Sequence, residues 1–366
     1  SQWLLELFHG PTLAFKDVAL QLLGLLFEEF LARDDSRLTI VGATSGDTGS
    51  AAIDAVAGRD NVEIFMLHPS GRVSDVQRRQ MTTVLAPNVH NIAIDGSFDD
   101  AQAMVKRIFA DEEVTGRHRI GAVNSINWAR LMAQVVYYFA AALQLGAPDR
   151  KTAFSVPTGN FGDVFAGHVA ARMGLPVERL VVATNVNDIL HRALSDGDYS
   201  AGDVTPTAAP SMDIQVSSNF ERLLFDVGGR DGVAMAEQMR GFEGSRAMLL
   251  TEAQRAGADL FTSARADADD MARSMRWACE EAGEVIDPHT AIGLHAARQQ
   301  ELAPGVPMVT LATAHPAKFR DAVERATGTR PPLPTRVGDL FAREERFVEL
   351  PGDYDAVKAH ILENAA

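Results

Sequence analysis

The sequence has a single cysteine, no long apolar run and comparatively few basic side chains. Cys279 cannot form an internal disulfide or a cysteine cluster for a metal, so we expect a reducing cytoplasm and no metal site. No apolar run reaches the length that spans a bilayer, and the N-terminus lacks the basic and then apolar layout of a signal peptide. We therefore expect no membrane partner.

Basic side chains are outnumbered, with 34 Lys and Arg against 49 Asp and Glu, which gives a formal net charge of −15. This charge repels a nucleic-acid backbone, so we expect no nucleic-acid partner and expect any anionic substrate to be held by a few local donors. A chain of 366 residues, 46% hydrophobic and 23% charged, is typical of a globular protein with two domains. Nothing in the sequence indicates an oligomeric state.

Short apolar segments alternate with helical patterns along most of the chain. The predicted strands cover residues 38–41, 62–67, 89–94, 152–156, 180–184, 308–312 and 346–350. Such alternation predicts an α/β fold with parallel sheets between layers of helices. We expect an N-terminal part, 1–123, with a smaller α/β domain at about 36–123, and a larger α/β domain at 124–366. The irregular region 196–218 is expected beside the active site, because long loops in compact domains are usually functional.

Lys16 stands between the aromatic Phe15 and the start of a helical pattern. Desolvation penalises the ammonium form, and a neutral amine condenses with an aldehyde. Lys16 is therefore a candidate for a Schiff base with a cofactor. A snorkelling lysine at a helix start is the alternative, and from this segment alone it is the commoner one.

A first glycine-rich loop, Gly159-Asn160-Phe161-Gly162, lies between a predicted strand and a predicted helix. Backbone N–H groups and the helix dipole can hold an anion there, and the glycines let the backbone close around a phosphate. The loop suits a permanently bound cofactor phosphate. A plain tight turn between strand and helix is the alternative.

A second loop, Ser45-Gly46-Asp47-Thr48, follows the predicted strand 38–41. Its hydroxyl and N–H groups can take a carboxylate, as an amino-acid substrate requires. The alternative is a cluster of N-capping residues, since Ser, Asp and Thr are all good caps. The charge of Asp47 disfavours a neighbouring carboxylate unless this side chain points elsewhere.

Arginines near predicted helix starts are candidates for binding a phosphate. Asn124 and Arg130 flank the entrance to the helix predicted at 128–145, and an arginine can clamp a phosphate with two hydrogen bonds. Arg72, Arg78 and Arg79 form another candidate anion-binding stretch. A surface salt bridge is the alternative for each of them.

Thr313 directly follows the predicted strand 308–312. Ligands of α/β proteins bind at the carboxyl edge of the sheet, which makes this hydroxyl a candidate contact. Capping of the next helix is the alternative.

Eight segments in chain order together resemble the threonine synthase family, which consists of pyridoxal-phosphate enzymes of the tryptophan-synthase-β fold type. The segments are Leu7 to Asp17, Ser45 to Gly49, Gly71 to Ser74, Val123 to Arg130, Thr158 to Asp163, Ser217 to Arg222, Asp287 to Ala291 and Thr313 to Phe319. The resemblance runs nearly end to end. It differs from the family at the front, where relatives carry an extra region of many tens of residues before the lysine motif.

The resemblance implies fold type II of the pyridoxal-phosphate enzymes, with two doubly wound α/β domains and the cofactor in the cleft. It implies that Lys16 holds pyridoxal 5'-phosphate and that Thr313 is the neutral partner of the pyridine nitrogen. The implied cofactor-phosphate residues are Gly159, Asn160, Phe161, Gly162 and Asp163. The implied contacts near the substrate carboxylate and the cofactor ring are Ser45, Gly46, Asp47 and Thr48, and those of the substrate phosphate are Asn124 and Arg130.

The implied activity is that of a carbon–oxygen lyase in threonine biosynthesis, which converts O-phospho-L-homoserine and water into L-threonine and phosphate. Protons leave Cα and Cβ, phosphate departs from Cγ and water adds at Cβ. The alternatives are a related phospho-lyase that gives 2-oxobutyrate, a serine or threonine dehydratase, and a truncated, non-catalytic cofactor-binding protein.

Overall fold

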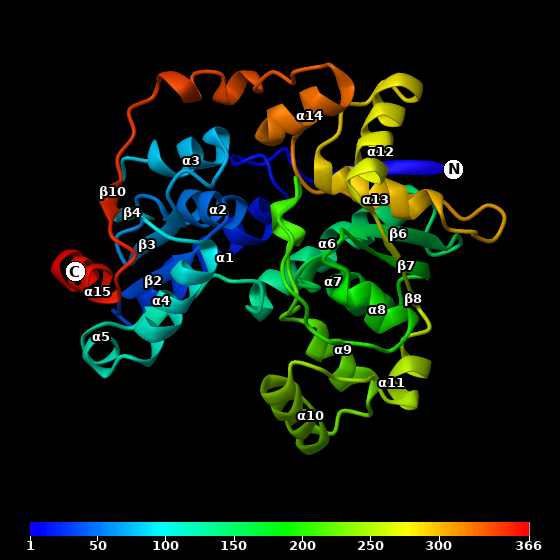
Figure 1. The fold of residues 1–366 in the computed structure, drawn as a ribbon, viewed down its shortest axis with the longest axis horizontal. Coiled ribbons are helices and arrows are strands. Elements are labelled where there is room, and N and C mark those ends of the chain that lie inside the picture. The colour runs from blue at the N-terminus through cyan, green and yellow to red at the C-terminus, as the bar shows by residue number, and fades with distance from the viewer. Residues whose placement is uncertain (366) are drawn as a thin grey trace. The chain divides into compact units, whose positions relative to one another are not determined.

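Two units, each with its own parallel sheet, make up the chain in the computed structural model, which describes residues 1–365 (Figure 1). Unit 1 comprises Ser1–Leu7 and Arg130–Pro331, and unit 2 comprises Phe8–Ala129 and Pro332–Ala366. This division differs from the predicted domains, because the end of the chain belongs with the early residues. The cause is a strand near the C-terminus that joins the sheet of unit 2.

The sheet of unit 2 has the strand order β10-β4-β3-β2-β5, and every neighbouring pair is parallel. Its strands are β2 (Leu38–Ala43), β3 (Val62–Pro69), β4 (Val89–Ile94), β5 (Ile120–Gly121) and β10 (Val348–Leu350). Its helices are α1 (Lys16–Arg33), α2 (Asp47–Val56), α3 (Asp75–Thr82), α4 (Phe98–Ala110), α5 (Glu112–Arg117) and α15 (Tyr354–Asn364). In Figure 1 the red segment with β10 lies beside β4.

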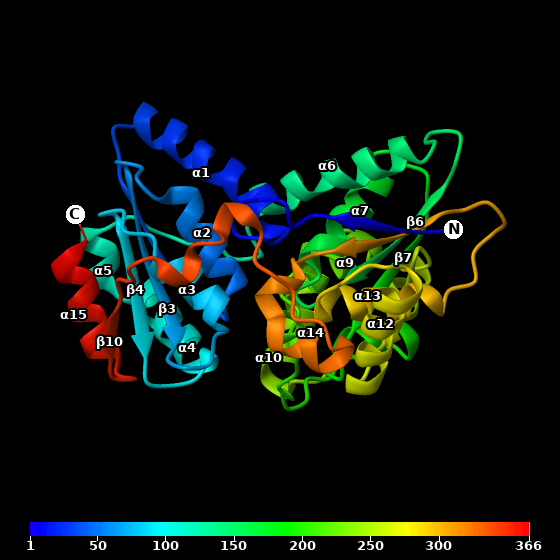
Figure 2. The same cartoon turned by 90° about the horizontal axis from the view of Figure 1, so that it is seen from above.

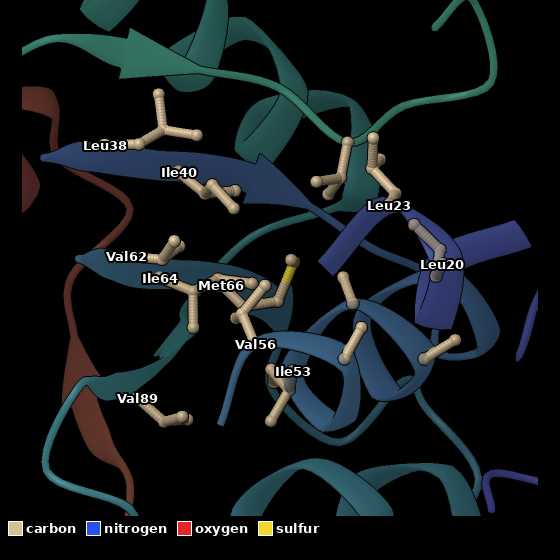
Figure 3. Close-up of a cluster of buried hydrophobic side chains, with 14 of the residues drawn as sticks. Leu20, Leu23, Leu38, Ile40, Ile53, Val56, Val62, Ile64, Met66 and Val89 are labelled. Atoms are coloured by element: carbon tan, nitrogen blue, oxygen red, sulfur yellow. The ribbon is translucent and has the colours of Figure 1, made fainter. Parts of the chain in front are cut away.

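Alternate residues of the central strands of unit 2 pack on opposite faces of the sheet. In β3, Ile64 and Met66 belong to a core with α1 and α2, whereas Phe65 and Leu67 belong to one with α4 and α15. Figure 3 shows side chains of α1 and α2 gathered against β2 and β3. Since both faces are covered, the central strands are mostly apolar on both sides, as in parallel sheets generally.

The sheet of unit 1 has the order β1-β9-β6-β7-β8, and its neighbouring strands are also parallel. Its strands are β1 (Gln2–Glu6), β6 (Thr152–Pro157), β7 (Val177–Thr184), β8 (Phe261–Arg265) and β9 (Met308–Ala312). Its helices are α6 (Trp128–Gln144), α7 (Gly162–Arg172), α8 (Ile189–Ser195), α9 (Phe220–Val227), α10 (Gly232–Ser245), α11 (Glu252–Gly257), α12 (Ala268–Glu281), α13 (Pro288–Arg298) and α14 (Arg320–Thr327). Within this unit, α6 and α7 lie on one side of the sheet and α12 and α13 on the other (Figure 2).

The predicted α/β fold with parallel sheets is confirmed, and each predicted strand overlaps an observed one. The prediction omitted β1, β5 and β8, which are edge strands, where a strand needs little apolar patterning. The region 196–218 has little regular structure apart from a 3-10 turn at Pro210–Met212. No helix formed by residues 1–365 combines the length and apolarity needed to cross a membrane.

Candidate active site

Lys16 is the first residue of α1, and its side chain is directed into unit 2 rather than to solvent. Only 8% of the residue is exposed. Its Nζ lies 3.5 Å from Oδ2 of Asp47 and 5.4 Å from the centre of the Phe15 ring. The amine therefore stands beside one carboxylate in an otherwise poorly solvated position.

The turn before Lys16 is held by Asp17. The carboxylate of Asp17 accepts hydrogen bonds from the backbone N–H of Thr12 at 2.9 Å and from the Thr12 hydroxyl at 2.5 Å. Leu13 adopts a left-handed backbone conformation with φ of 64°, and its N–H donates to the carbonyl of Gly10. These contacts fix the direction in which the chain enters α1.

The loop after β2 brings Asp47 to the start of α2. The hydroxyl of Thr44 accepts hydrogen bonds from the N–H groups of Gly46 and Gly49 at 2.9 and 2.8 Å. Thr44 thus accepts from N–H groups at the start of α2 that have no partner inside the helix. The alternative interpretation gave this capping role to Ser45, Asp47 and Thr48, but the hydroxyl that caps the helix is that of Thr44. Ser45 and Thr48 are half-buried, and Asp47 is buried.

In unit 1, the loop from Gly159 to Phe161 joins β6 to the start of α7. Phe161 has a left-handed backbone with φ of 62°, and its buried ring packs against Phe220 and Phe261. A Cβ on Gly159 would lie 2.5 Å from the carbonyl oxygen of Ser211, so this position admits only glycine without rearrangement. The glycine is thus required by a close approach of two backbone segments.

Residues 217–219 border this loop and bind its acceptors. The Ser217 hydroxyl donates to the carbonyl of Gly159 at 2.8 Å, and the Asn219 N–H donates to that of Asn160 at 3.1 Å. The Ser218 hydroxyl donates to Oδ1 of Asn160 at 3.1 Å. The acceptor groups of the loop are thereby occupied, which suits a loop whose N–H groups bind an anion.

Asp163, the second residue of α7, has a buried carboxyl group that is held by two tyrosines. The hydroxyls of Tyr137 and Tyr138 donate to Oδ1 at 2.5 and 2.9 Å, whereas Oδ2 is buried and has no hydrogen-bond partner within residues 1–365. Burial raises the pKa of Asp163 to about 6, although both tyrosine hydrogen bonds act in the opposite direction.

Arg130 is buried near the start of α6, with 4% of the residue exposed. Burial lowers the pKa of Arg130 to about 10, and interaction with Tyr137, two turns further along the helix, acts in the opposite direction. The guanidinium remains a cation at neutral pH. Because Tyr137 also binds Asp163, this tyrosine connects the arginine with the start of α7.

Thr313 is buried directly after β9. Ser155 of β6 pairs with Thr310 of the parallel strand β9. Three residues further along each strand, Thr158 and Thr313 therefore stand at the same level of the sheet. Thr313 and the Gly159 loop therefore lie at the same carboxyl edge of the sheet. Asn124 belongs to unit 2, where it is exposed and its carbonyl accepts from the N–H of Asn127.

The predicted site residues thus form two groups. Lys16, Ser45, Gly46, Asp47, Thr48 and Asn124 belong to unit 2, and Arg130, Gly159, Asn160, Phe161, Gly162, Asp163 and Thr313 belong to unit 1. Arg78 and Arg79, the alternative anion ligands, both form ion pairs with Glu345, as the salt-bridge alternative predicted. No group of side chains within residues 1–365 is arranged to hold a metal ion.

Sequence reasoning did not identify Tyr137, Tyr138 or Gln77. The two tyrosines are adjacent in a largely apolar part of the helix, and their hydroxyls were the available signal that this part binds a polar group. Gln77 donates from Nε2 to Oδ1 of Asp47 at 2.8 Å. The sequence shows Gln77 only as one of several polar residues in a short helix, and its burial is known from the structure alone.

Two family models match the chain. Residues 3–259 match the model described as pyridoxal-phosphate dependent enzyme, and residues 290–361 match the model described as threonine synthase, C-terminal. A curated threonine synthase of Pseudomonas aeruginosa is 57% identical over 100% of this chain and 78% of its own length. The similarity therefore extends over both units.

Solved structures agree with the sequence comparison. A threonine synthase of Brucella melitensis with pyridoxal phosphate bound superposes with a TM-score of 0.96, at 52% identity over 100% of this chain and 78% of that one. Threonine synthase from yeast superposes with a TM-score of 0.93, at 40% identity over 99% of this chain and 78% of that one.

Proposed function

Because the chain belongs to the threonine synthase family of pyridoxal-phosphate-dependent lyases, we propose that it converts O-phospho-L-homoserine and water into L-threonine and phosphate. The alternative functions considered from the sequence are not favoured, because relatives similar along the full chain are named threonine synthases. The observation that carries the assignment of residues is the buried amine of Lys16 beside Asp47.

The residues present fit the cofactor at its phosphate end. The Gly159 loop has no room for a Cβ, its acceptors are bound by residues 217–219, and it opens directly onto the N-terminus of α7. Helix N-termini stabilise a phosphate through their N–H groups and dipole. We assign the cofactor phosphate to Gly159, Asn160, Phe161 and Gly162, with Asp163 supporting the loop.

Lys16 supplies the amine that binds the cofactor aldehyde. Once released, its Nζ takes protons from the substrate carbons and returns them. When bound, pyridoxal phosphate withdraws electrons from the substrate, so that carbon atoms near the amino group can lose protons. The carboxylate of Asp47 places a negative charge 3.5 Å from Nζ. Burial keeps water away from the amine. The hydroxyl of Thr313 is assigned to the ring nitrogen.

The substrate has two anionic ends that need different ligands. Arg130 keeps its positive charge although it is buried, which suits the phosphate, and Asn124 is assigned to the same group. The loop of Ser45, Gly46 and Thr48 offers hydroxyl and N–H donors for the substrate carboxylate. These ligands set the orientation in which the proton-bearing carbons face the amine.

The test is the Lys16→Ala variant, with Lys106→Ala on the exposed face of α4 as the matched control. We expect Lys16→Ala to lose the visible absorbance of the lysine-bound cofactor and to release no phosphate from O-phospho-L-homoserine. The control keeps both. Turnover by Lys16→Ala would refute the assignment of this lysine.

Measuring all products in one assay distinguishes the proposed reaction from its alternatives. We expect phosphate and L-threonine in equal amounts and no 2-oxobutyrate. Phosphate with 2-oxobutyrate in place of threonine identifies the phospho-lyase. No phosphate at all is the result expected of a dehydratase or of a non-catalytic protein.

The cellular setting is a further part of the proposal. A cytoplasmic location is supported by the single cysteine, and the absence of a nucleic-acid partner is supported by the net charge of −15.

A further inference from the structure

Helix α3 presents two buried glutamines to the region around Lys16. Gln77 and Gln80 are one turn apart, so they lie on the same side of the helix. Gln77 donates to Oδ1 of Asp47 at 2.8 Å, and Gln80 donates to the carbonyl of Thr12 at 2.9 Å. One face of α3 therefore binds both the loop after β2 and the turn that precedes Lys16.

Gly46 provides the space in which Gln77 reaches Asp47. A Cβ on Gly46 would lie 2.5 Å from the amide carbon of Gln77, and the backbone at Gly46 has a φ of 133°, which glycine adopts readily. The amide of Gln77 thus lies directly against this loop. Any side chain at Gly46 displaces the amide or the loop.

The two oxygens of Asp47 have different partners. Oδ1 accepts the hydrogen bond from Gln77, and Oδ2 faces the amine of Lys16 at 3.5 Å. All three side chains are buried. A neutral donor on one oxygen stabilises the buried carboxylate without adding a second positive charge, so the negative charge remains directed at Lys16.

The opposite side of α3 is anchored by Glu345. Arg78 and Arg79 both form ion pairs with this carboxylate, and the Thr82 hydroxyl donates to it at 2.7 Å. The hydroxyl of Ser74 caps the start of the helix by accepting from the N–H of Gln77. These contacts fix the rotation of α3 and so the direction of its glutamines.

We propose that Gln77 is a positioning residue for the reaction, which orients the carboxylate of Asp47 toward the amine of Lys16. The proposal rests on the proposed function, since it assumes that Lys16 binds the cofactor. Gln77 itself touches neither Lys16 nor a substrate group in this role. It acts through Asp47 by holding one of its oxygens and leaving the other to the amine.

Two substitutions in the cofactor-loaded protein test this role. Gln77→Met keeps the length of the side chain but removes the donor, whereas Gln77→Glu keeps the shape and adds a negative charge. Loss of a hydrogen bond to a charged group predicts a fall in kcat of about ten- to a hundredfold for Gln77→Met, with KM changed less than about threefold.

The visible absorbance of the lysine-bound cofactor gives a readout that a structural role does not move. Its pH midpoint reports how well the surroundings stabilise a positive charge on the nitrogen of Lys16. We expect the midpoint to shift to lower pH in Gln77→Met, because Asp47 is no longer held, and to higher pH in Gln77→Glu, because a negative charge is added.

Thr83→Val, at the residue that follows the last residue of α3, is the matched control. Its hydroxyl donates to the carbonyl of Arg79 at 2.6 Å and has no contact with Asp47 or Lys16. We expect this variant to keep kcat and the spectral midpoint. Equal losses of kcat in Thr83→Val and Gln77→Met, or unchanged kcat and midpoint in Gln77→Met, overturn the proposal.

If Gln77→Met fails to fold, the spectral midpoint of Gln77→Glu decides alone, and an unchanged midpoint in that variant also overturns the role of Gln77. A negative result here leaves the proposed function intact, because the product assay and the Lys16→Ala variant test that function separately.

Discussion

The hydroxyl of Tyr137 donates a hydrogen bond to Oδ1 of Asp163 at 2.5 Å and thereby joins helix α6 to the first turn of α7. Tyr137 also lies near Arg130, whose pKa it influences. The residues assigned to the two phosphates, that of the cofactor and that of the substrate, are thus connected within unit 1 by one phenol.

The proton of Asp163 makes the stability of the protein depend on pH. Burial raises the pKa of this carboxyl from 3.8 to about 6, so the folded protein keeps a proton that the unfolded chain loses between these values. Its stabilising contribution is complete below pH 3.8 and is lost as the pH rises to about 6. A difference of about two pH units corresponds to about 3 kcal/mol.

Asp163→Asn removes this contribution and keeps an acceptor for both tyrosines. We compare the free energies of unfolding of the cofactor-free variant and the unchanged protein, measured with urea at about pH 4 and at about pH 7. We expect Asp163→Asn to be more stable relative to the unchanged protein at the higher pH than at the lower one. An equal difference at both pH values contradicts the raised pKa.

Gly159→Ala forces a Cβ to within 2.5 Å of the carbonyl oxygen of Ser211. We expect the loop to move and the affinity for pyridoxal phosphate to fall at least about tenfold, since one misplaced donor costs about 1–3 kcal/mol. Titration of the cofactor-free protein, followed by absorbance, measures the change.

Gly241→Ala is the control for Gly159→Ala. Gly241 lies inside α10, where a Cβ meets no atom within 4 Å. There alanine stabilises the helix by about 0.5–1 kcal/mol and leaves cofactor affinity unchanged. Equal affinities of the two variants contradict the assigned phosphate loop.

Arg130→Lys keeps the buried charge but removes the planar group that donates two parallel hydrogen bonds. We expect KM for O-phospho-L-homoserine to rise about tenfold or more, with a smaller change in kcat. Steady-state kinetics measure both. Arg172→Lys at the exposed end of α7 is the control, and an unchanged KM in Arg130→Lys removes this residue from the substrate site.

Glu345→Gln weakens the contacts of Arg78, Arg79 and Thr82, all of which bind this carboxylate. We expect a loss of about 1–3 kcal/mol in the free energy of unfolding, because two half-buried cations lose the charge of their shared partner. Thermal unfolding compared with Glu344→Gln, an exposed neighbour, measures it. If both variants unfold at the same temperature, α3 does not depend on Glu345.

Much of the fold was predictable because its signals are local. Each strand-loop-helix segment carries its own apolar run and glycine loop, and the position of Lys16 at a helix start followed from the spacing of the next apolar residues. The domain division was less accessible. Pairing of β10 with β4 joins residues about 250 positions apart, and parallel pairing leaves no turn signature in the sequence.

The sequence by itself determined which residues are candidates for the chemistry, since lysine, glycine loops and a threonine after a strand are recognisable by type and place. Only the tertiary structure decided their partners. Gln77 meets Asp47 from 30 residues away, Tyr137 meets Asp163 from 26, and Arg78 meets Glu345 from 267. Such contacts depend on how helices pack on the sheets, because a hydrogen bond between distant residues needs the burial and orientation that packing alone supplies.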